Sequence, residues 1–361
     1  NLQVFRDRLN QAGMLDQNFD FHLASGAWSA RCYKAEMEAA LRTKDFAGFQ
    51  LLDLQDFPGQ GTALVGILDA FMDSKGVVER DTWLHSCNDV TLLLEFPRYC
   101  WQTDETFRAA LKIANYSNRD LVDDITWSII DQNGNIIKAG FFEDIHIAKG
   151  GLHTAGELET ALAAVDQADK LSIRLACIKN HYSNVYHIWV YPIAEKAIDH
   201  LGITIAEELN DDVLKHLLHG DKVLLFPTHE SIEEKSVGGL FHPDFWNYGM
   251  FKSISESVNK PVSPGTLSLL MQPDHPLFNS FPTDFHTNWQ WWSIIRAGRP
   301  LILDPTPDDY RPLVQMIDNL QRNHKLGFIF EFAVGKGKLL ICMSRLNEIT
   351  DKPEAQQLYQ S

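Results

Sequence analysis

Apolar and polar residues alternate over residues 88–192, and this two-residue period is typical of β-strands that bury one face. The segments "DITWSII" (124–130) and "NIIKAGFF" (135–142) flank Asp131-Gln132-Asn133-Gly134, which is a hairpin turn signal. Other predicted strands place alternating side chains on one face, namely Phe107, Ala109, Leu111 and Ile113; Leu171, Ile173, Leu175 and Cys177; and Tyr186, Ile188 and Val190. Several short strands within about 100 residues predict an immunoglobulin-like β-sandwich over residues 87–193.

Residues 194–361 return to a pattern in which strands and helices alternate. Continuous apolar runs predict strands, and periodic segments predict helices. The predicted strands lie at 222–227, 266–272, 300–304 and twice within 326–344, and the predicted helices at 211–220 and 310–323. The pattern predicts an open α/β domain of flavodoxin-like type over residues 194–361.

Residues 1–86 are predicted to form helix, helix, strand, loop and helix, which is the order found in parallel sheets covered by helices. The second helix spans 33–46 and the short strand "FQLLDL" spans 49–54. One strand cannot form a sheet, so this part is incomplete, or it packs on a neighbouring domain. The sequence begins with Asn1 rather than Met, and we expect it to be part of a longer chain.

Charge limits the partners of the chain. The formal net charge of its 361 residues is −16, which argues against binding to nucleic acid or to an anionic membrane, because phosphate groups require clustered Lys and Arg. No apolar run approaches the ~20 residues of a membrane span, and the first residues lack the parts of a signal peptide. The five cysteines are far apart and form no CxxC motif, so we expect buried thiols rather than zinc ligands.

A polar loop follows the predicted strand at 49–54. It carries Asp53, Gln55, Asp56 and Gln60, with Pro58, Gly59 and Gly61 to turn the chain. Carboxylates and amides at the end of a strand can hydrogen-bond a polar ligand, so we predict that these four side chains bind substrate. They do not provide an obvious acid and nucleophile pair.

Three tryptophans lie close together in "NWQWWSIIRAGRP", at Trp289, Trp291 and Trp292. Indole rings stack on the apolar faces of sugars, which makes these residues a candidate carbohydrate platform. Packing at a domain interface is the commoner use of such residues, and both interpretations stay open.

Other chemical motifs are missing. Neither G-x-S-x-G nor G-x-C-x-G occurs, which disfavours a nucleophile elbow in the last domain. The run Gly335-Lys336-Gly337-Lys338 lies between two predicted strands and lacks phosphate-loop spacing, so it is interpreted as a hairpin turn. The histidines match no metal-binding pattern, and no metal or other cofactor is predicted.

Residues 23–76 resemble the end of the catalytic barrel in bacterial, chiefly Bacteroides-type, enzymes of glycoside hydrolase family 2. The resemblance depends on "GFQLLDLQDFPGQGTALVG" (48–66) followed by "DSKG" (73–76), and the rest of the chain is similar to the accessory region of those proteins. It implies that 49–54 is the eighth strand of a (β/α)8 barrel and that 1–86 ends the catalytic domain. The last domain would then resemble a glutamine-amidotransferase-like fold.

The family is one of β-galactosidase-like, retaining exo-glycosidases that act on oligosaccharides and polysaccharides. The resemblance implies that both catalytic glutamates lie upstream of Asn1, so no catalytic residue is assigned here and we expect no turnover by this chain alone. It further implies a carbohydrate ligand, contact with the rest of the barrel, and a periplasmic or extracellular location. The alternative is a carbohydrate-binding or structural accessory module without catalysis.

Overall fold

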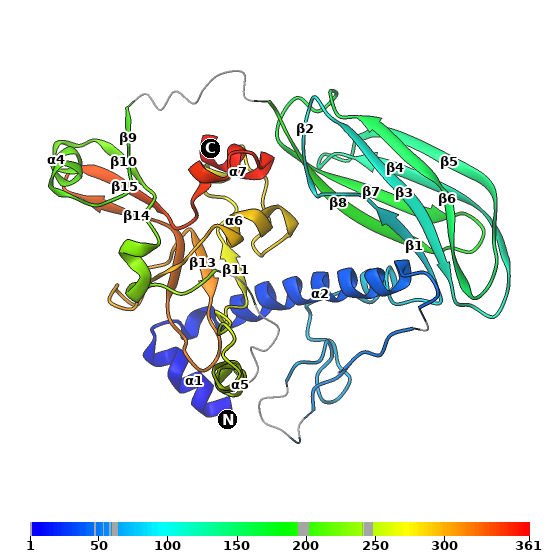
Figure 1. The fold of residues 1–361 in the computed structure, drawn as a ribbon, viewed down its shortest axis with the longest axis horizontal. Helices are drawn as coiled ribbons and strands as arrows, with labels where there is room; N and C mark the ends of the chain where they lie inside the picture. The colour runs from blue at the N-terminus through cyan, green and yellow to red at the C-terminus, as the bar shows by residue number, and fades with distance from the viewer. Residues whose placement is uncertain are drawn as a thin grey trace.

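A computed structural model describes residues 2–46, 48–52, 54–57, 59, 64–193, 202–239, 241 and 248–361. A β-sandwich lies on one side of the molecule and a mixed sheet with short helices lies on the other (Figure 1). Helix α2 (Asn18–Arg42) runs from one to the other and contacts strands of both. The fold is therefore a mixed α and β architecture, and the described residues form no barrel.

The N-terminal part is mainly helical. It contains α1 (Leu2–Gln11), the 3-10 helix η1 (Leu15–Gln17), α2 and α3 (Arg80–Leu84). Helix α2 is rich in good helix formers, and Glu38 pairs with Lys34 and Arg42, each four residues away. The helix predicted at 33–46 is thus the second half of a longer helix that ends at Arg42.

The strand predicted at 49–54 is wrong for the described residues of that segment. They belong to no strand, and the nearest ladder element is an isolated bridge between Gln55 and Leu68. A short apolar run becomes a strand only when neighbouring strands offer backbone partners. No strand of the described residues pairs with this segment, so its described residues form part of a loop that lies below α2 in the view of Figure 1.

The period-two segments form the two sheets of a sandwich. One sheet has the order β1-β3-β6 and the other β2-β8-β7-β4-β5. The strand bounds are β1 (Val90–Glu95), β2 (Cys100–Gln102), β3 (Thr106–Asn115), β4 (Leu121–Ile130), β5 (Ile136–Ile147), β6 (Gly151–Ala161), β7 (Asp169–Cys177) and β8 (Ser183–Tyr191). Fully buried residues of both sheets, such as Leu111 and Ile173, share one core.

The hairpin predicted at Asp131–Gly134 is confirmed between β4 and β5. The Asp131 carboxylate accepts hydrogen bonds from the backbone N–H of Asn133 (2.9 Å) and Asn135 (2.7 Å). Gly134 has a φ of 87°, in the left-handed region that glycine adopts without a steric penalty. The turn thereby fixes the register of β4 against β5.

The C-terminal part is built on one seven-stranded sheet with the order β11-β13-β14-β15-β10-β9, to which β12 adds beside β14. The strand bounds are β9 (Ile203–Ala206), β10 (Lys222–Leu225), β11 (Ser268–Met271), β12 (Leu301–Ile302), β13 (Val314–Ile317), β14 (Leu326–Val334) and β15 (Gly337–Cys342). The helices are α4 (Asp211–His219), η2 (Glu230–Lys235), α5 (Tyr248–Ser257), η4 (Pro276–Phe278), η5 (Trp289–Trp291), α6 (Trp292–Arg296), η6 (Leu346–Glu348) and α7 (Pro353–Gln360). Strands β9, β10 and β15 run parallel to one another, whereas the pairs from β15 through β14 and β13 to β11 are antiparallel.

Of two predictions made for this part of the sequence, the structure confirms one and contradicts the other. The hairpin within 326–344 is confirmed as β14 and β15. The helix predicted at 310–323 is wrong, because residues 314–317 form the buried strand β13 between β11 and β14. All four side chains of β13 are buried, and a short, mostly apolar segment fits a strand that is buried on both faces as well as it fits a helix.

Candidate functional site

The predicted substrate-binding loop is only partly described. Asp53 and Gln60 lie outside the described residues, and Gln55 is exposed. Asp56 is buried, and its Oδ1 accepts hydrogen bonds from Lys75 Nζ (2.6 Å) and from the backbone N–H of Gly66 (2.9 Å). Asp56 therefore braces the loop, and the structure does not present its carboxylate to a ligand.

Lys75 also contributes to the interactions that hold this loop in place. Its ammonium group also donates to the carbonyl oxygen of Gly66 at 2.8 Å. A Cβ on Gly66 would lie 2.3 Å from the carbonyl carbon of Gln55, so the chains pass too closely for a larger residue. The sequence analysis missed the Asp56–Lys75 pair, although both residues belong to the two motifs that carry the family resemblance.

The same segment exposes many large apolar side chains. We call residues 46–72 the apolar lobe. Its exposed residues are Phe46, Phe49, Leu52, Leu54, Phe57, Leu64, Phe71 and Met72. Leu52 is 79% exposed and Phe71 85% exposed. A concentration of exposed apolar side chains is typical of a surface that another chain segment or protein covers.

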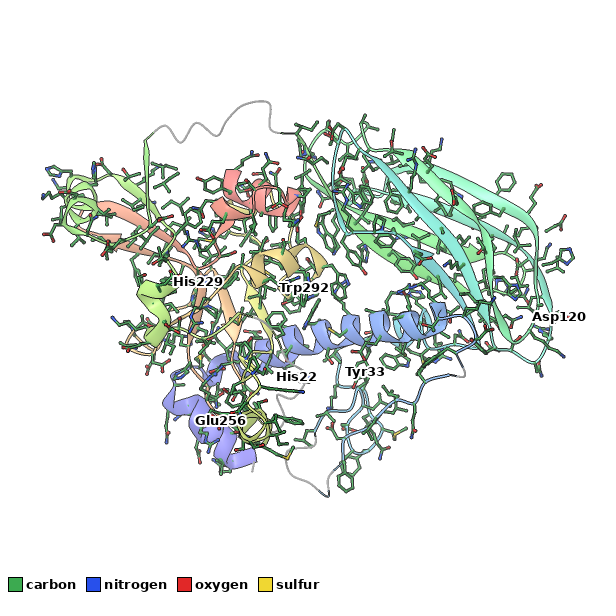
Figure 2. All side chains as sticks on the ribbon, viewed as in Figure 1. His22, Tyr33, Asp120, His229, Glu256 and Trp292 are labelled. Atoms are coloured by element: carbon green, nitrogen blue, oxygen red, sulfur yellow. The ribbon has the colours of Figure 1, made fainter. Side chains whose placement is uncertain are left out.

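The three tryptophans of the predicted platform have different surroundings. Trp291 is fully buried and donates from Nε1 to Thr283 Oγ1 at 2.9 Å. Trp289 is partly buried, and its ring stacks on Tyr99 with centroids 5.2 Å apart. Trp292, on α6, is 41% exposed (Figure 2). The three rings do not share a surface, and Trp289 packs the mixed sheet against the sandwich.

A cluster of charges lies where α2, the sandwich and the mixed sheet meet. Lys170 of β7 donates to Asp284 at 2.8 Å and 3.1 Å, Arg31 of α2 lies 3.6 Å from Asp284, and Asn288 donates to it at 3.0 Å. Burial by itself raises the pKa of Asp284, but the cations of Lys170 and Arg31 lower that pKa to about 2. The carboxylate therefore stays ionised and joins the three parts of the fold.

His187 of β8 faces the same cluster. Burial lowers the pKa of His187 to about 3, and the nearby cations of Lys170 and Arg31 act in the same direction. In the unfolded chain a histidine titrates near 6.5. As the pH falls through 6.5, the unfolded chain therefore binds a proton that the folded protein excludes.

Acid is expected to destabilise the protein through His187. The stabilising contribution of the neutral ring is fully present above pH 6.5 and is lost as the pH falls toward about 3. Thermal unfolding midpoints between pH 7 and pH 4 should fall less steeply in His187→Gln than in the wild type. His146→Gln changes an exposed histidine of β5 and serves as the matched control. Equal slopes in His187→Gln and the wild type would contradict the assignment.

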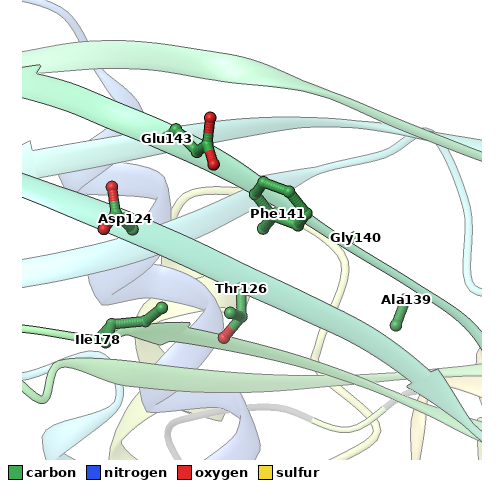
Figure 3. Close-up of a pocket in the computed structure, with 7 residues that line it drawn as sticks. All are labelled: Asp124, Thr126, Ala139, Gly140, Phe141, Glu143 and Ile178. Carbon is green, nitrogen blue, oxygen red and sulfur yellow. The ribbon is translucent and has the colours of Figure 1, made fainter.

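Among the hollows lined by described residues, two are considered, and both are open to the surface. One, of about 440 Å³, lies on the outer face of β4 and β5 (Figure 3). It is lined by Asp124, Thr126, Ala139, Gly140, Phe141, Glu143 and Ile178. The other, of about 550 Å³, lies between the start of α2 and the edge strand β11. Its lining includes carboxylates, amides and one phenylalanine.

The described residues contain neither a metal-binding cluster nor a membrane-spanning helix. No group of three or more His, Cys, Asp or Glu side chains is placed there to hold a metal ion. Within the same ranges, no helix combines the length and the apolar character needed to cross a membrane. The described cysteines are free thiols, and burial raises the pKa of Cys342 to about 12.

Two protein-family models match parts of the chain, and neither family has a known activity. A domain of unknown function, DUF8488, matches residues 105–192, and another, DUF8487, matches residues 204–361. None of the curated proteins matches the chain.

The similarity to solved structures is weak. The CARDB domain of a Pyrococcus furiosus protein in complex with di-metal ions is 10% identical, with a TM-score of 0.23, covering 29% of this chain and 94% of that chain. A β-glucosidase from Listeria innocua in complex with glucose is 14% identical, with a TM-score of 0.24, covering 30% of this chain and 17% of that enzyme. Likeness at this level carries no inference about function.

Proposed function

We propose that this chain acts as the C-terminal part of a retaining, β-galactosidase-like exo-glycosidase of family 2, with both catalytic glutamates upstream of Asn1. The resemblance of residues 23–76 to the end of the catalytic barrel supports the proposal. In this account residues 1–86 complete a (β/α)8 barrel, and the sandwich is immunoglobulin-like. The mixed sheet is an accessory domain of flavodoxin-like or glutamine-amidotransferase-like type.

The observation that carries the proposal is the apolar lobe. Among the described residues between 46 and 72, eight large apolar side chains are exposed, within the segment that resembles the last barrel strand and its loop. Burying a leucine or phenylalanine side chain contributes about 1.5–3 kcal/mol, so a partner that covers the lobe gains substantial free energy. A barrel that supplies a neighbouring strand would also pair the backbone of residues 49–54.

The proposed chemistry is divided between the two parts of the enzyme. One upstream glutamate attacks the anomeric carbon and the other protonates the leaving oxygen. This chain contributes the rim of the active site, because strands of such barrels end at the catalytic face. Gln55, Asp53 and Gln60 are proposed to hydrogen-bond sugar hydroxyls, while Asp56 and Lys75 hold the loop in place.

The ligand proposed for the complete enzyme is an oligosaccharide or polysaccharide, and the proposed location is periplasmic or extracellular. The remainder of the barrel is the proposed partner of the apolar lobe. In this proposal Trp289 and Trp291 stabilise the packing of the domains. Of the three tryptophans, Trp292 is the one exposed enough to contact a sugar.

Activity measurements on two polypeptides test the proposal. The chain 1–361 is expected to show no turnover of an aryl β-galactoside, whereas a longer polypeptide that includes the upstream barrel is expected to hydrolyse it. Replacing either proposed upstream glutamate by glutamine should lower kcat at least about 10²-fold. Turnover by residues 1–361 alone that is lost in Asp56→Asn would overturn the proposal.

A further inference from the structure

A lysine, a glutamate and an asparagine contact one another where α2 meets the sandwich (Figure 1). Lys34 Nζ lies 2.5 Å from Glu38 Oε1 and 2.5 Å from Asn184 Oδ1. Asn184 Nδ2 donates to the same oxygen of Glu38 at 3.0 Å. Lys34 and Glu38 are one turn apart on α2, whereas Asn184 belongs to β8 and is 150 residues from Lys34. Each of the three side chains therefore contacts the other two across the contact between α2 and β8.

The surroundings of this triad exclude most water. Asn184 is fully buried, Glu38 is 3% exposed, and the buried ring of Tyr186 has its centroid 4.6 Å from Lys34 Nζ. Burial lowers the pKa of the Lys34 ammonium, and the nearby carboxylate of Glu38 offsets only part of this effect. A lower pKa makes the neutral amine easier to form, and the neutral amine is the nucleophilic form of a lysine.

The carboxamide of Asn184 is held in one orientation. Its Nδ2 donates to the carbonyl oxygen of Leu92 at 2.7 Å and to the hydroxyl oxygen of Tyr186 at 3.0 Å. Its Oδ1 accepts from the backbone N–H of Val185 at 2.8 Å. Because a C=O bond is about 1.2 Å long, the side-chain carbonyl carbon lies at most about 3.7 Å from Lys34 Nζ. The Val185 N–H can stabilise the negative charge that develops on Oδ1 when a nucleophile adds to that carbon.

We propose that Lys34 and Asn184 become joined by an intramolecular isopeptide bond, with Glu38 as the group that transfers the protons. Glu38 accepts a proton from the Lys34 ammonium, and the neutral amine adds to the side-chain carbonyl carbon of Asn184. The bond from that carbon to the original amide nitrogen then breaks. Of the three ammonium protons, one stays on the new amide nitrogen and two pass through Glu38 to the departing nitrogen, which leaves as an ammonium ion. One C–N bond forms and one breaks, so the reaction needs no oxidant and no cofactor.

The proposed bond ties the second half of α2 to the first residues of β8. Like a disulfide, it restricts the unfolded chain, and the restriction is large because the linked residues are 150 positions apart. It forms within this chain and uses no residue of the polar loop at 53–60. The cross-link is therefore independent of the proposed hydrolysis.

Measurement of the intact mass of the chain 1–361 under denaturing conditions tests the proposal. The wild type is expected to be lighter than the mass of its sequence by one ammonia molecule. Trypsin should release a branched peptide in which residues 32–42 are joined to residues 180–196, because trypsin does not cleave after an acylated lysine. A wild-type mass equal to the sequence mass rules the bond out, whatever the variants show.

Two variants identify the reacting groups. Lys34→Arg keeps a cation beside Glu38 but removes the nucleophilic amine, and Glu38→Gln removes the proton carrier. Each variant should have the full mass of its own sequence, and thermal melting checks that each one folds. The matched control is Lys170→Arg, because the side chain of Lys170 is 23% exposed, close to the 24% of Lys34, and also pairs with a carboxylate.

The control Lys170→Arg should keep the loss of one ammonia molecule. A loss that persists in Lys34→Arg, or that peptide mapping places at another residue, would contradict the proposal. Neither result bears on barrel-dependent hydrolysis, so the proposed function is tested separately.

Discussion

Replacing Asp284 by alanine is expected to lower the free energy of unfolding by about 3 kcal/mol. The substitution leaves the cations of Lys170 and Arg31 without their shared carboxylate at a site where all three side chains are about three-quarters buried. Chemical denaturation of the wild type and the variant at neutral pH gives the difference directly. Part of the loss should appear as weaker coupling between the sandwich and the C-terminal part, because Lys170 belongs to β7 of the sandwich and Asp284 lies in the segment between η4 and η5.

Asp274→Ala is the matched control for Asp284→Ala. Asp274 is an exposed carboxylate in the same connecting region and has no ion pair within the described residues, so its loss should change stability by less than about 0.5 kcal/mol. In a Lys170→Met background the effect of Asp284→Ala should shrink, since the two side chains act on each other. An Asp284→Ala protein as stable as the Asp274→Ala protein would show that the cluster does not stabilise the fold.

Replacing Trp291 by alanine is expected to cost about 3–5 kcal/mol, because the fully buried indole would leave a large cavity. Its ring packs edge-on against Phe281 with centroids 5.4 Å apart, and Phe281 stacks on Tyr191 of β8. The loss therefore extends to the contact between the mixed sheet and the sandwich. Thermal and chemical unfolding both measure it.

Trp292→Ala provides the comparison for Trp291→Ala, since the two residues are neighbours and Trp292 is 41% exposed. Its expected cost is below about 1 kcal/mol. Trp291→Phe should recover part of the stability that Trp291→Ala loses, because it fills part of the cavity. If Trp291→Ala destabilises no more than Trp292→Ala, the assignment of Trp291 to the core is wrong.

Sequence patterns predicted the secondary structure well where the residues of an element specify it by themselves. The alternation over 88–192 and the Asp131–Gly134 turn specify strands and one hairpin without reference to the rest of the chain. The helix predicted at 211–220 is also confirmed as α4, and the structure shows that Asn210 caps it and that Gly220 ends it with a φ of 108°.

The two incorrect elements depended on neighbours that are distant in sequence. Residues 314–317 became a strand because β11 and β14 lie on either side and pair with it. The described residues of 49–54 form a loop because no strand in the described part of the chain pairs with them. Intrinsic strand propensity is weak compared with the free energy of pairing and packing, and a sequence pattern does not show which partners will be present.

The candidate sites could likewise be predicted only in part, because their contacts join residues that are far apart in the sequence. A polar loop could be located at 53–60, but the pairing of Asp56 with Lys75 across 19 residues required the structure. No motif of the sequence singles out Asp284, because its partners Arg31 and Lys170 come from α2 and β7. Beside the cavity at the start of α2, Arg311 donates to Asp16 across 295 residues, and residue spacing cannot predict a contact over such a sequence separation.

A comparison of the apolar lobe in two contexts tests the central claim most directly. The double variant Leu52→Ser and Phe71→Ser removes two side chains that are 79% and 85% exposed in this chain. In residues 1–361 alone it should change the free energy of unfolding by less than about 0.5 kcal/mol. In the longer polypeptide with the upstream barrel it should lower stability by about 3 kcal/mol, because both side chains would then be buried. Equal effects in the two polypeptides would contradict the claim that the barrel covers this lobe.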